Sequence, residues 1–88
     1  MAPAGPRSFL VSLFEAAVRA ADPLAAIQAH LPPRPRGRTV VIGAGKAASQ
    51  MAAAFETAWD APCEGVVVAR HGPVEATRHV RVLQSAHP

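Results

Sequence analysis

The chain has 88 residues, a formal net charge of +3 and a hydrophobic content of 50%. This length fits one small domain or a part of a larger one, and the hydrophobic content excludes a disordered tail. The single cysteine, Cys63, excludes an internal disulfide and a cysteine-rich zinc site, and it fits a reducing, cytoplasmic setting. The apolar run over residues 9–14 is too short and too amphipathic for a signal peptide or a membrane span.

The N-terminal third predicts two helices. Residues 1–7 are rich in proline, alanine and glycine, and we expect them to be disordered. After Ser8, the predicted N-cap, apolar residues recur at helical spacing. Asp22 followed by Pro23 is typical of a second helix start, and the prolines further on end that helix. We therefore expect a helical hairpin over residues 8–31.

Residues 32–38 form a connector rich in proline and arginine, which we expect to be extended and solvated. No aromatic residues lie between its arginines, so we expect no nucleic-acid partner. Residues 39–88 predict the beginning of a Rossmann-like, three-layer α/β domain built on a parallel βαβ unit. Its strands read as short apolar runs, which is typical of strands covered on both faces. The expected elements are strand 39–42, helix 45–59 with an inner face carrying Met51, strand 65–69 and strand 80–83.

A chain this short is marginally stable at best, and a three-strand piece of parallel sheet is worse off, because parallel sheets normally need both faces covered. We therefore interpret the chain as the N-terminal part of a longer protein.

The most informative motif is the turn Gly43-Ala44-Gly45-Lys46, between the first strand and the helix. A glycine turn at a helix N-terminus directs backbone N–H groups toward one point, and the lysine adds a positive charge there. The motif predicts a binding site for a phosphate or another anion.

Three further residues are candidates for the same site. Ser49 lies one helical turn after Gly45 and could reach a ligand there. Arg70 and His87 follow the second and third predicted strands. Because ligands in open α/β sheets bind outside the carboxyl ends of the strands, we expect these residues to converge with the glycine turn.

Local pattern alone leaves alternatives open. The turn is too short for a Walker A loop and lacks its hydroxyl residue. The spacing of Gly43, Gly45 and Ala48 matches the dinucleotide pattern G-x-G-x-x-A, and Arg70 would suit a 2′-phosphate, so an NADP-dependent reductase stays open. The glycines could also be purely structural, with Lys46 solvated.

Several short stretches, in a fixed order, resemble one known family; they are residues 13–18, 21–23, 30–33, 41–48, 51–52, 64–68, 70–72 and 86–88. The chain is similar to the N-terminus of the glycerate 2-kinase family, which has a DUF4147 N-terminal domain and a MOFRL C-terminal domain. Some members are labelled hydroxypyruvate reductase. Two positions depart from the family pattern: Ala86 stands where glycine is common, and Pro73 where histidine is common.

The resemblance implies ATP-dependent phosphorylation of D-glycerate to 2-phosphoglycerate, with Mg²⁺, in a cleft between two α/β domains. It makes Lys46 the active-site lysine, and it implies that a C-terminal domain of the same chain completes the site. The 88 residues alone are then expected to be inactive, and the base and metal ligands are expected beyond Pro88. The alternatives are an NADP-dependent hydroxypyruvate reductase and a non-catalytic phosphosugar-binding module; homo-oligomerisation stays open.

Overall fold

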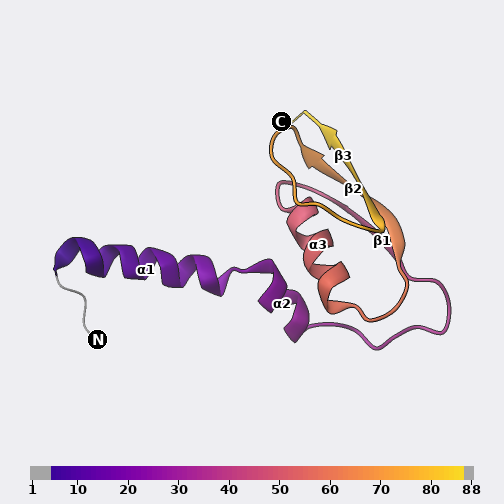
Figure 1. Ribbon diagram of the computed structural model, residues 1–88, viewed down its shortest axis with the longest axis horizontal. Helices are drawn as coiled ribbons and strands as arrows, with labels where there is room; N and C mark the ends of the chain where they lie inside the picture. Colours follow the sequence, from indigo (N-terminus) through magenta and orange to yellow (C-terminus); the bar gives the residue numbers. More distant parts are fainter. Residues whose placement is uncertain (1–4, 87–88) are drawn as a thin grey trace.

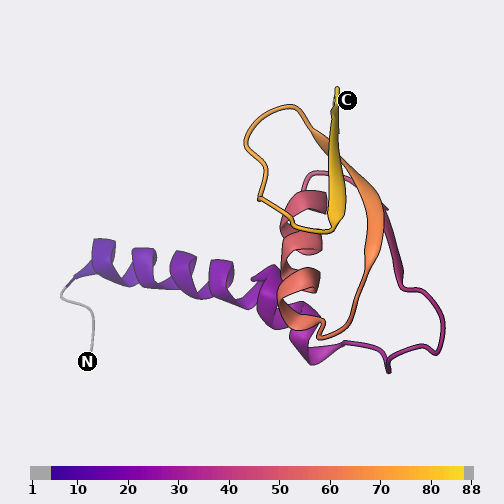
Figure 2. The same ribbon diagram turned by 45° about the vertical axis from the view of Figure 1, so that its right-hand side comes forward.

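A computed structural model describes residues 5–86 of the chain. In chain order its elements are α1 (Pro6–Ala20), α2 (Pro23–Ala29), β1 (Val40–Ala44), α3 (Ala48–Ala58), β2 (Glu64–Arg70) and β3 (Val80–Ser85) (Figure 1). The strands form one parallel sheet in the order β1-β2-β3, with α3 connecting β1 to β2. Figure 2 shows α3 on one side of the sheet. The predicted α/β fold with a parallel βαβ unit is confirmed.

Each strand extends further toward its carboxyl end than the sequence predicted. Pairing with β2 carries β1 through its glycine to Ala44, which lies beside Val68. It likewise carries β3 to Ser85, which lies beside Arg70. The valine-rich segments supply strand propensity, but the ladder of hydrogen bonds decides where each strand ends.

The core lies between α3 and the sheet, where Ala52, Val67 and Val80 are buried. Small alanines bring the helix close to the strands. The predicted inner face of α3 is wrong for Met51, which is 51% exposed, whereas the buried residues of α3 are Ser49, Ala52, Ala54 and Glu56. The helix is apolar on several sides, so periodicity alone does not identify the side that meets the sheet.

Glu56 holds the loop between β2 and β3, residues 71–79, against the helix. Its buried carboxylate accepts hydrogen bonds from three consecutive backbone N–H groups, at 2.8, 2.5 and 2.8 Å, those of Arg78, His79 and Val80. Burial raises the pKa of Glu56, but these three bonds outweigh it, and the pKa lies below its ordinary value. The carboxylate thus fixes the point at which β3 begins.

We expect Glu56→Gln to lower the free energy of unfolding by about 2–3 kcal/mol at pH 7, because an amide lacks the charge and offers only one acceptor oxygen. Because the folded-state pKa is depressed, the carboxylate's contribution is fully present above the ordinary value of 4.5. It is lost as the pH falls through the folded-state pKa. Urea titrations of both proteins at pH 7 and pH 3 measure this, and the difference should shrink at pH 3.

The matched control is Glu15→Gln, which changes an exposed glutamate on α1 in the same way. It should leave stability unchanged within about 0.5 kcal/mol. Equal losses from the two substitutions at pH 7 would contradict the role assigned to Glu56.

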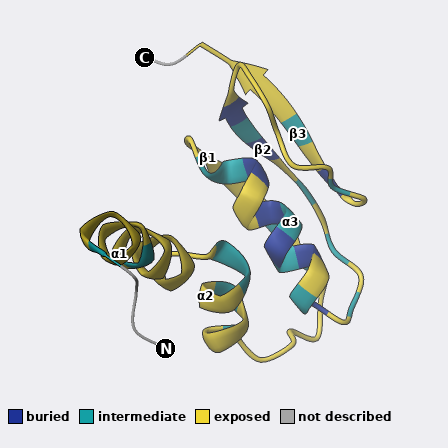
Figure 3. Cartoon of the chain, turned by 60° about the vertical axis from the view of Figure 1, so that its left-hand side comes forward, coloured by how far each residue is buried: buried dark blue, intermediate teal, exposed yellow. Residues whose placement is uncertain are grey.

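The helix α1 extends away from the rest of the chain (Figures 1 and 2), and it is exposed over most of its length (Figure 3). Both predicted N-terminal helices are confirmed, but they do not fold back on each other as a hairpin, since α2 packs on α3 instead. α1 begins at Pro6, not after Ser8, because proline is favoured in the first turn of a helix. Pro6 and Arg7, expected to be disordered, therefore belong to the helix. Its apolar side chains are exposed, with Phe14 at 68%.

The connector is less free than the sequence suggested, because two of its three arginines have acidic partners. Arg38 Nε donates to Glu64 Oε1 at 2.6 Å, and Arg34 Nε lies 3.9 Å from Asp60 Oδ1. Both pairs are exposed, so each contributes little to stability. They do orient the connector where it enters β1.

The sequence predicted strands that are covered on both faces. Within residues 5–86, only one face of the sheet packs against a helix. Ile42 on β1 is 80% exposed and Val40 is 56% exposed. Among the described helices, none combines the length and the apolar character needed to cross a membrane.

Candidate functional site

The glycine turn forms as the sequence predicted, although α3 begins later, at Ala48. β1 ends at Ala44, and Gly45 has a φ of +134°, in the region of backbone conformation that favours glycine. The N–H of Gly45 donates to the carbonyl of Val68 at 3.0 Å, which holds the turn against β2. The carbonyl of Gly45 accepts from the N–H of Ala48 at 3.2 Å, which starts the helix. The turn is therefore fixed at both ends.

Lys46 lies in this turn, two residues before α3, and is exposed. The first N–H groups of a helix have no acceptor within the helix, and the helix dipole places partial positive charge there. Together they form an electropositive corner at the carboxyl end of β1. That corner can bind a phosphate or a carboxylate.

The turn opens into a hollow of about 880 Å³ between β1, α3 and α2. Among the described residues that line it, Lys46 alone is charged. The remaining lining is mostly apolar and includes Ile27, Ile42, Met51, Phe55 and Trp59. One cation in an apolar hollow suits a ligand with one anionic end, because the apolar walls weaken the competition from water.

Arg70 lies at the same end of the sheet as Lys46, but its side chain lies on the other face of the sheet. The register places Arg70 two residues beyond the position of β2 that pairs with Ala44. Val67 and Ala69 are buried against α3, so strand alternation places the Arg70 side chain on the opposite face. Arg70 does not line the hollow beside Lys46. The carboxyl ends of β1 and β2 lie at the same end of the sheet, but the cations Lys46 and Arg70 are not brought to one point.

The turn after β2 is anchored by contacts that the sequence did not predict. The N–H of His71 donates to the carbonyl of Ser85 at 3.0 Å, and Gln84 Nε2 donates to the carbonyl of Gly72 at 3.3 Å. The Ser85 backbone and the Gln84 side chain, at the end of β3, therefore hold the turn that follows Arg70.

Ser49 is placed under the β2–β3 loop and not in the open turn. Its side chain is 3% exposed, and its Oγ accepts a hydrogen bond from the N–H of Glu75 at 3.1 Å. Ser49 and Glu56 are seven residues apart, so they share one face of α3 and hold the same loop at two points. The structure thus assigns Ser49 an anchoring contact in place of the predicted ligand contact. His87 lies outside the described residues.

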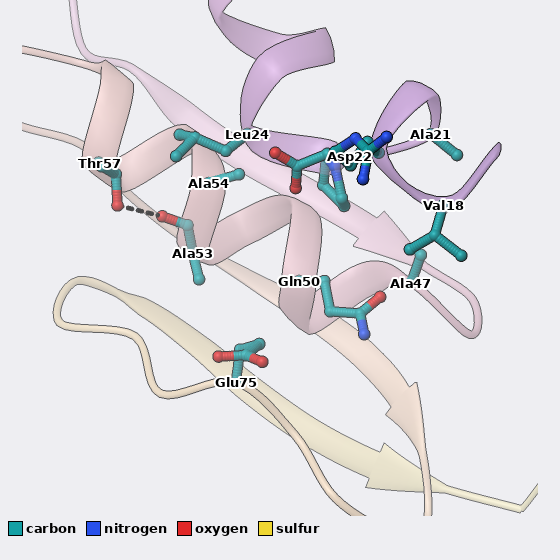
Figure 4. A pocket seen from close by; sticks show the side chains of 12 residues that line it. Val18, Ala21, Asp22, Leu24, Ala47, Gln50, Ala53, Ala54, Thr57 and Glu75 are labelled. Atoms are coloured by element: carbon teal, nitrogen blue, oxygen red, sulfur yellow. Dashed lines mark hydrogen bonds between the residues drawn. The ribbon is translucent and has the colours of Figure 1, made fainter. Parts of the chain in front are cut away.

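A second hollow, of about 980 Å³, separates the junction of α1 and α2 from α3 (Figure 4). Gln50 and Thr57 of α3 line it, together with Asp22 and Glu75, and the Thr57 hydroxyl already donates to the carbonyl of Ala53 at 3.0 Å. Of the predicted ligand-binding residues that the structure describes, none lines it. We therefore assign the candidate site to the glycine turn.

Within residues 5–86 no three His, Cys, Asp or Glu side chains gather as metal ligands. Burial raises the pKa of the Cys63 thiol, and the Glu56 carboxylate raises it further against the opposing charge of Arg78. A raised pKa disfavours the nucleophilic thiolate, which argues against a reactive thiol at Cys63.

Comparisons with known proteins agree with the resemblance noted in the sequence. Residues 9–88 match the family described as "Domain of unknown function (DUF4147)". An Agrobacterium vitis protein named "Putative hydroxypyruvate reductase" is 47% identical over 83 residues, which are 93% of this chain and 19% of that protein. A second protein of the same name and organism is 49% identical over 53 residues, which are 59% of this chain and 14% of that protein.

The chain thus spans about a fifth of the length of the first of these relatives. No solved structure gives a significant match. The match to the family model covers nearly the whole chain, and the chain therefore belongs to the DUF4147 family, which groups glycerate 2-kinase-like and hydroxypyruvate reductase-like proteins.

Proposed function

We propose that this segment is the phosphate-handling part of a kinase that transfers the γ-phosphoryl group of ATP to the 2-hydroxyl of D-glycerate. The observation that carries the proposal is Lys46 on a fixed glycine turn, at a helix N-terminus, where it is the one charged residue among the described residues that line an apolar hollow. A small hydroxy acid has one carboxylate and little else that is charged. That charge distribution is complementary to the hollow.

Phosphoryl transfer suits such a site because it depends on alignment and charge stabilisation more than on covalent help from the protein. The Lys46 ammonium would neutralise either the substrate carboxylate or the oxygens of the transferring group. The N–H groups at the start of α3 would bind further oxygens without side-chain rearrangement. The fixed turn keeps these donors in place before substrate arrives, which limits reorganisation in the transition state.

The described residues fit the phosphates of ATP better than they fit Mg²⁺. The turn offers backbone donors and one cation, but no cluster of carboxylates comes together in residues 5–86. We propose that Mg²⁺ arrives with the nucleotide and takes its protein ligands from the rest of the polypeptide. Bound there, the metal would neutralise charge on the phosphate oxygens.

The remainder of the polypeptide is also the proposed source of the catalytic base. The described acidic residues near the sheet have structural roles, since Glu56 holds the β2–β3 loop and Glu64 pairs with Arg38. The 88 residues alone should therefore bind anions without turnover.

The second candidate is an NADP-dependent hydroxypyruvate reductase, favoured by the names of the two relatives and by the spacing of Gly43, Gly45 and Ala48. In that case Arg70 would bind the 2′-phosphate from the end of β2. Lys46 would be dispensable, because a dinucleotide turn uses backbone at that position. The two candidates share the turn and differ in which cation matters.

Initial rates on the full-length protein separate the two candidates. One assay contains D-glycerate with Mg-ATP and measures ADP, and the other contains hydroxypyruvate with NADPH and measures NADPH oxidation. We expect ADP release that depends on glycerate. NADPH oxidation without ADP release would establish the reductase. The absence of both activities would favour the non-catalytic module that binds phosphosugars.

A further inference from the structure

β1 is an edge strand of the described sheet, and its outer edge has unpaired backbone groups. The N–H of Gly45 donates to the carbonyl of Val68 on β2. Successive N–H groups along a paired strand point to alternate sides, so those of Val40, Ile42 and Ala44 point away from β2, toward the outer edge of β1. These three N–H groups have no backbone acceptor within residues 5–86. An uncovered edge of this kind is a ready template for another strand.

The two edges of the sheet differ in chemistry. The sequence of β3, Val-Arg-Val-Leu-Gln-Ser, places Arg81 and Gln84 on its edge strand, as proteins commonly do to discourage pairing. The sequence of β1, Val-Val-Ile-Gly-Ala, has no charged or polar side chain at all. Uniformly apolar strands are typical of the interior of parallel sheets. Of the two edges, β1 is the one built to be paired.

Burial around β1 agrees with this reading of its sequence. Ile42 is the most exposed of the large apolar side chains of the sheet, and Val40 beside it is more than half exposed. On the α3 side, the apolar hollow runs along the whole length of β1. Both faces of this strand are therefore open to further apolar side chains.

We propose that β1 is an interior strand in the full-length protein, and that a parallel strand from the rest of the same polypeptide pairs with its outer edge. The proposal concerns assembly of the domain and does not depend on which reaction the protein catalyses. The relatives are long enough to supply that strand, because the matched residues are only 19% of the first one. The added strand would end beside Gly45 and form the second wall of the ligand crevice.

A second copy of the chain is a poorer occupant for geometric reasons. Two copies of one strand that meet edge to edge across a two-fold axis perpendicular to the sheet run antiparallel. That arrangement would make a mixed sheet, whereas every observed pairing is parallel. It would also place the partner's glycine turn at the opposite end of the sheet, where it could not complete this site.

Residue-resolved hydrogen exchange on the full-length protein tests the proposal. The amides of Val40, Ile42 and Ala44 face outward, and those of Val41 and Gly43 face β2 and serve as the internal control. We expect both sets to be protected at least about 100-fold, as in an interior strand. Free exchange of the outward set beside a protected inward set would overturn the proposal. So would outward protection that is lost on dilution to monomers, since a second copy would then be the occupant.

A substitution gives an independent test. Proline at position 42 removes the outward N–H and is tolerated only if that N–H faces solvent. Ile42→Ala removes the side chain but keeps the N–H, and it is the matched control. We expect Ile42→Pro to lower the Tm of the full-length protein by several degrees more than Ile42→Ala. Equal Tm values for the two variants would place β1 at a free edge and overturn the proposal.

Discussion

Lys46→Ala should lower kcat/KM for glycerate phosphorylation by about 10²–10³-fold in the full-length protein, the loss typical of removing one preorganised charge-stabilising donor. Within residues 5–86, Lys46 is the single charged residue that lines the hollow beside the glycine turn, so no described neighbour would substitute for it. Steady-state kinetics with both substrates varied would measure the change. Lys46→Arg should recover part of the activity, because it keeps the charge but alters the donor geometry.

The matched control is Arg36→Ala, which removes another exposed cation from the connector, away from the turn. It should leave kcat/KM within about twofold of the original protein, as expected of a surface change outside the site. If Lys46→Ala behaves like Arg36→Ala, the lysine has no part in the reaction and the kinase assignment loses its main support.

Gly65→Ala should be the most damaging single substitution for the fold. Gly65, the second residue of β2, has a φ of +148°, and a Cβ built there would lie 1.9 Å from the carbonyl oxygen of Val41 on the neighbouring strand. Both atoms belong to a rigid ladder, so neither can move aside without breaking the pairing of β1 with β2. The expected loss is about 3–5 kcal/mol, a large part of the stability of a small domain.

Gly43→Ala is the control for that prediction, because Gly43 lies in the same ladder without a positive φ. A Cβ there would meet the Val67 side chain at 3.5 Å, an ordinary contact. Circular dichroism and urea unfolding should show near-original stability for Gly43→Ala and loss of the cooperative transition for Gly65→Ala. Comparable stability of the two variants would contradict the close approach of β1 and β2 at Gly65.

The elements with local signals were predictable from the sequence. Short apolar runs rich in valine predicted the parallel strands, and the glycines at positions 43 and 45 predicted the turn that carries Lys46. These signals depend on neighbouring residues, and tertiary contacts here reinforced them. The exact strand ends were less predictable, because pairing with β2 and not local propensity sets them.

Features that depend on distant contacts were not predictable. Ser49 and Glu56 bind backbone groups 22 to 26 residues further along the chain, and no local pattern marks them as loop anchors. The same holds for Arg38 with Glu64, which are 26 residues apart. The orientation of α1 was also missed, because an apolar helical face indicates burial without identifying what covers it.

Identification of the product by ³¹P and ¹H NMR would decide the proposed function. The full-length protein would be incubated with D-glycerate and Mg-ATP, with the Lys46→Ala variant in parallel. We predict that a phosphate ester appears on the 2-hydroxyl of glycerate with the original protein and is absent with the variant on the same timescale. No glycerate phosphate from the original protein, together with NADPH consumption when hydroxypyruvate is supplied, would contradict the kinase assignment and establish the reductase.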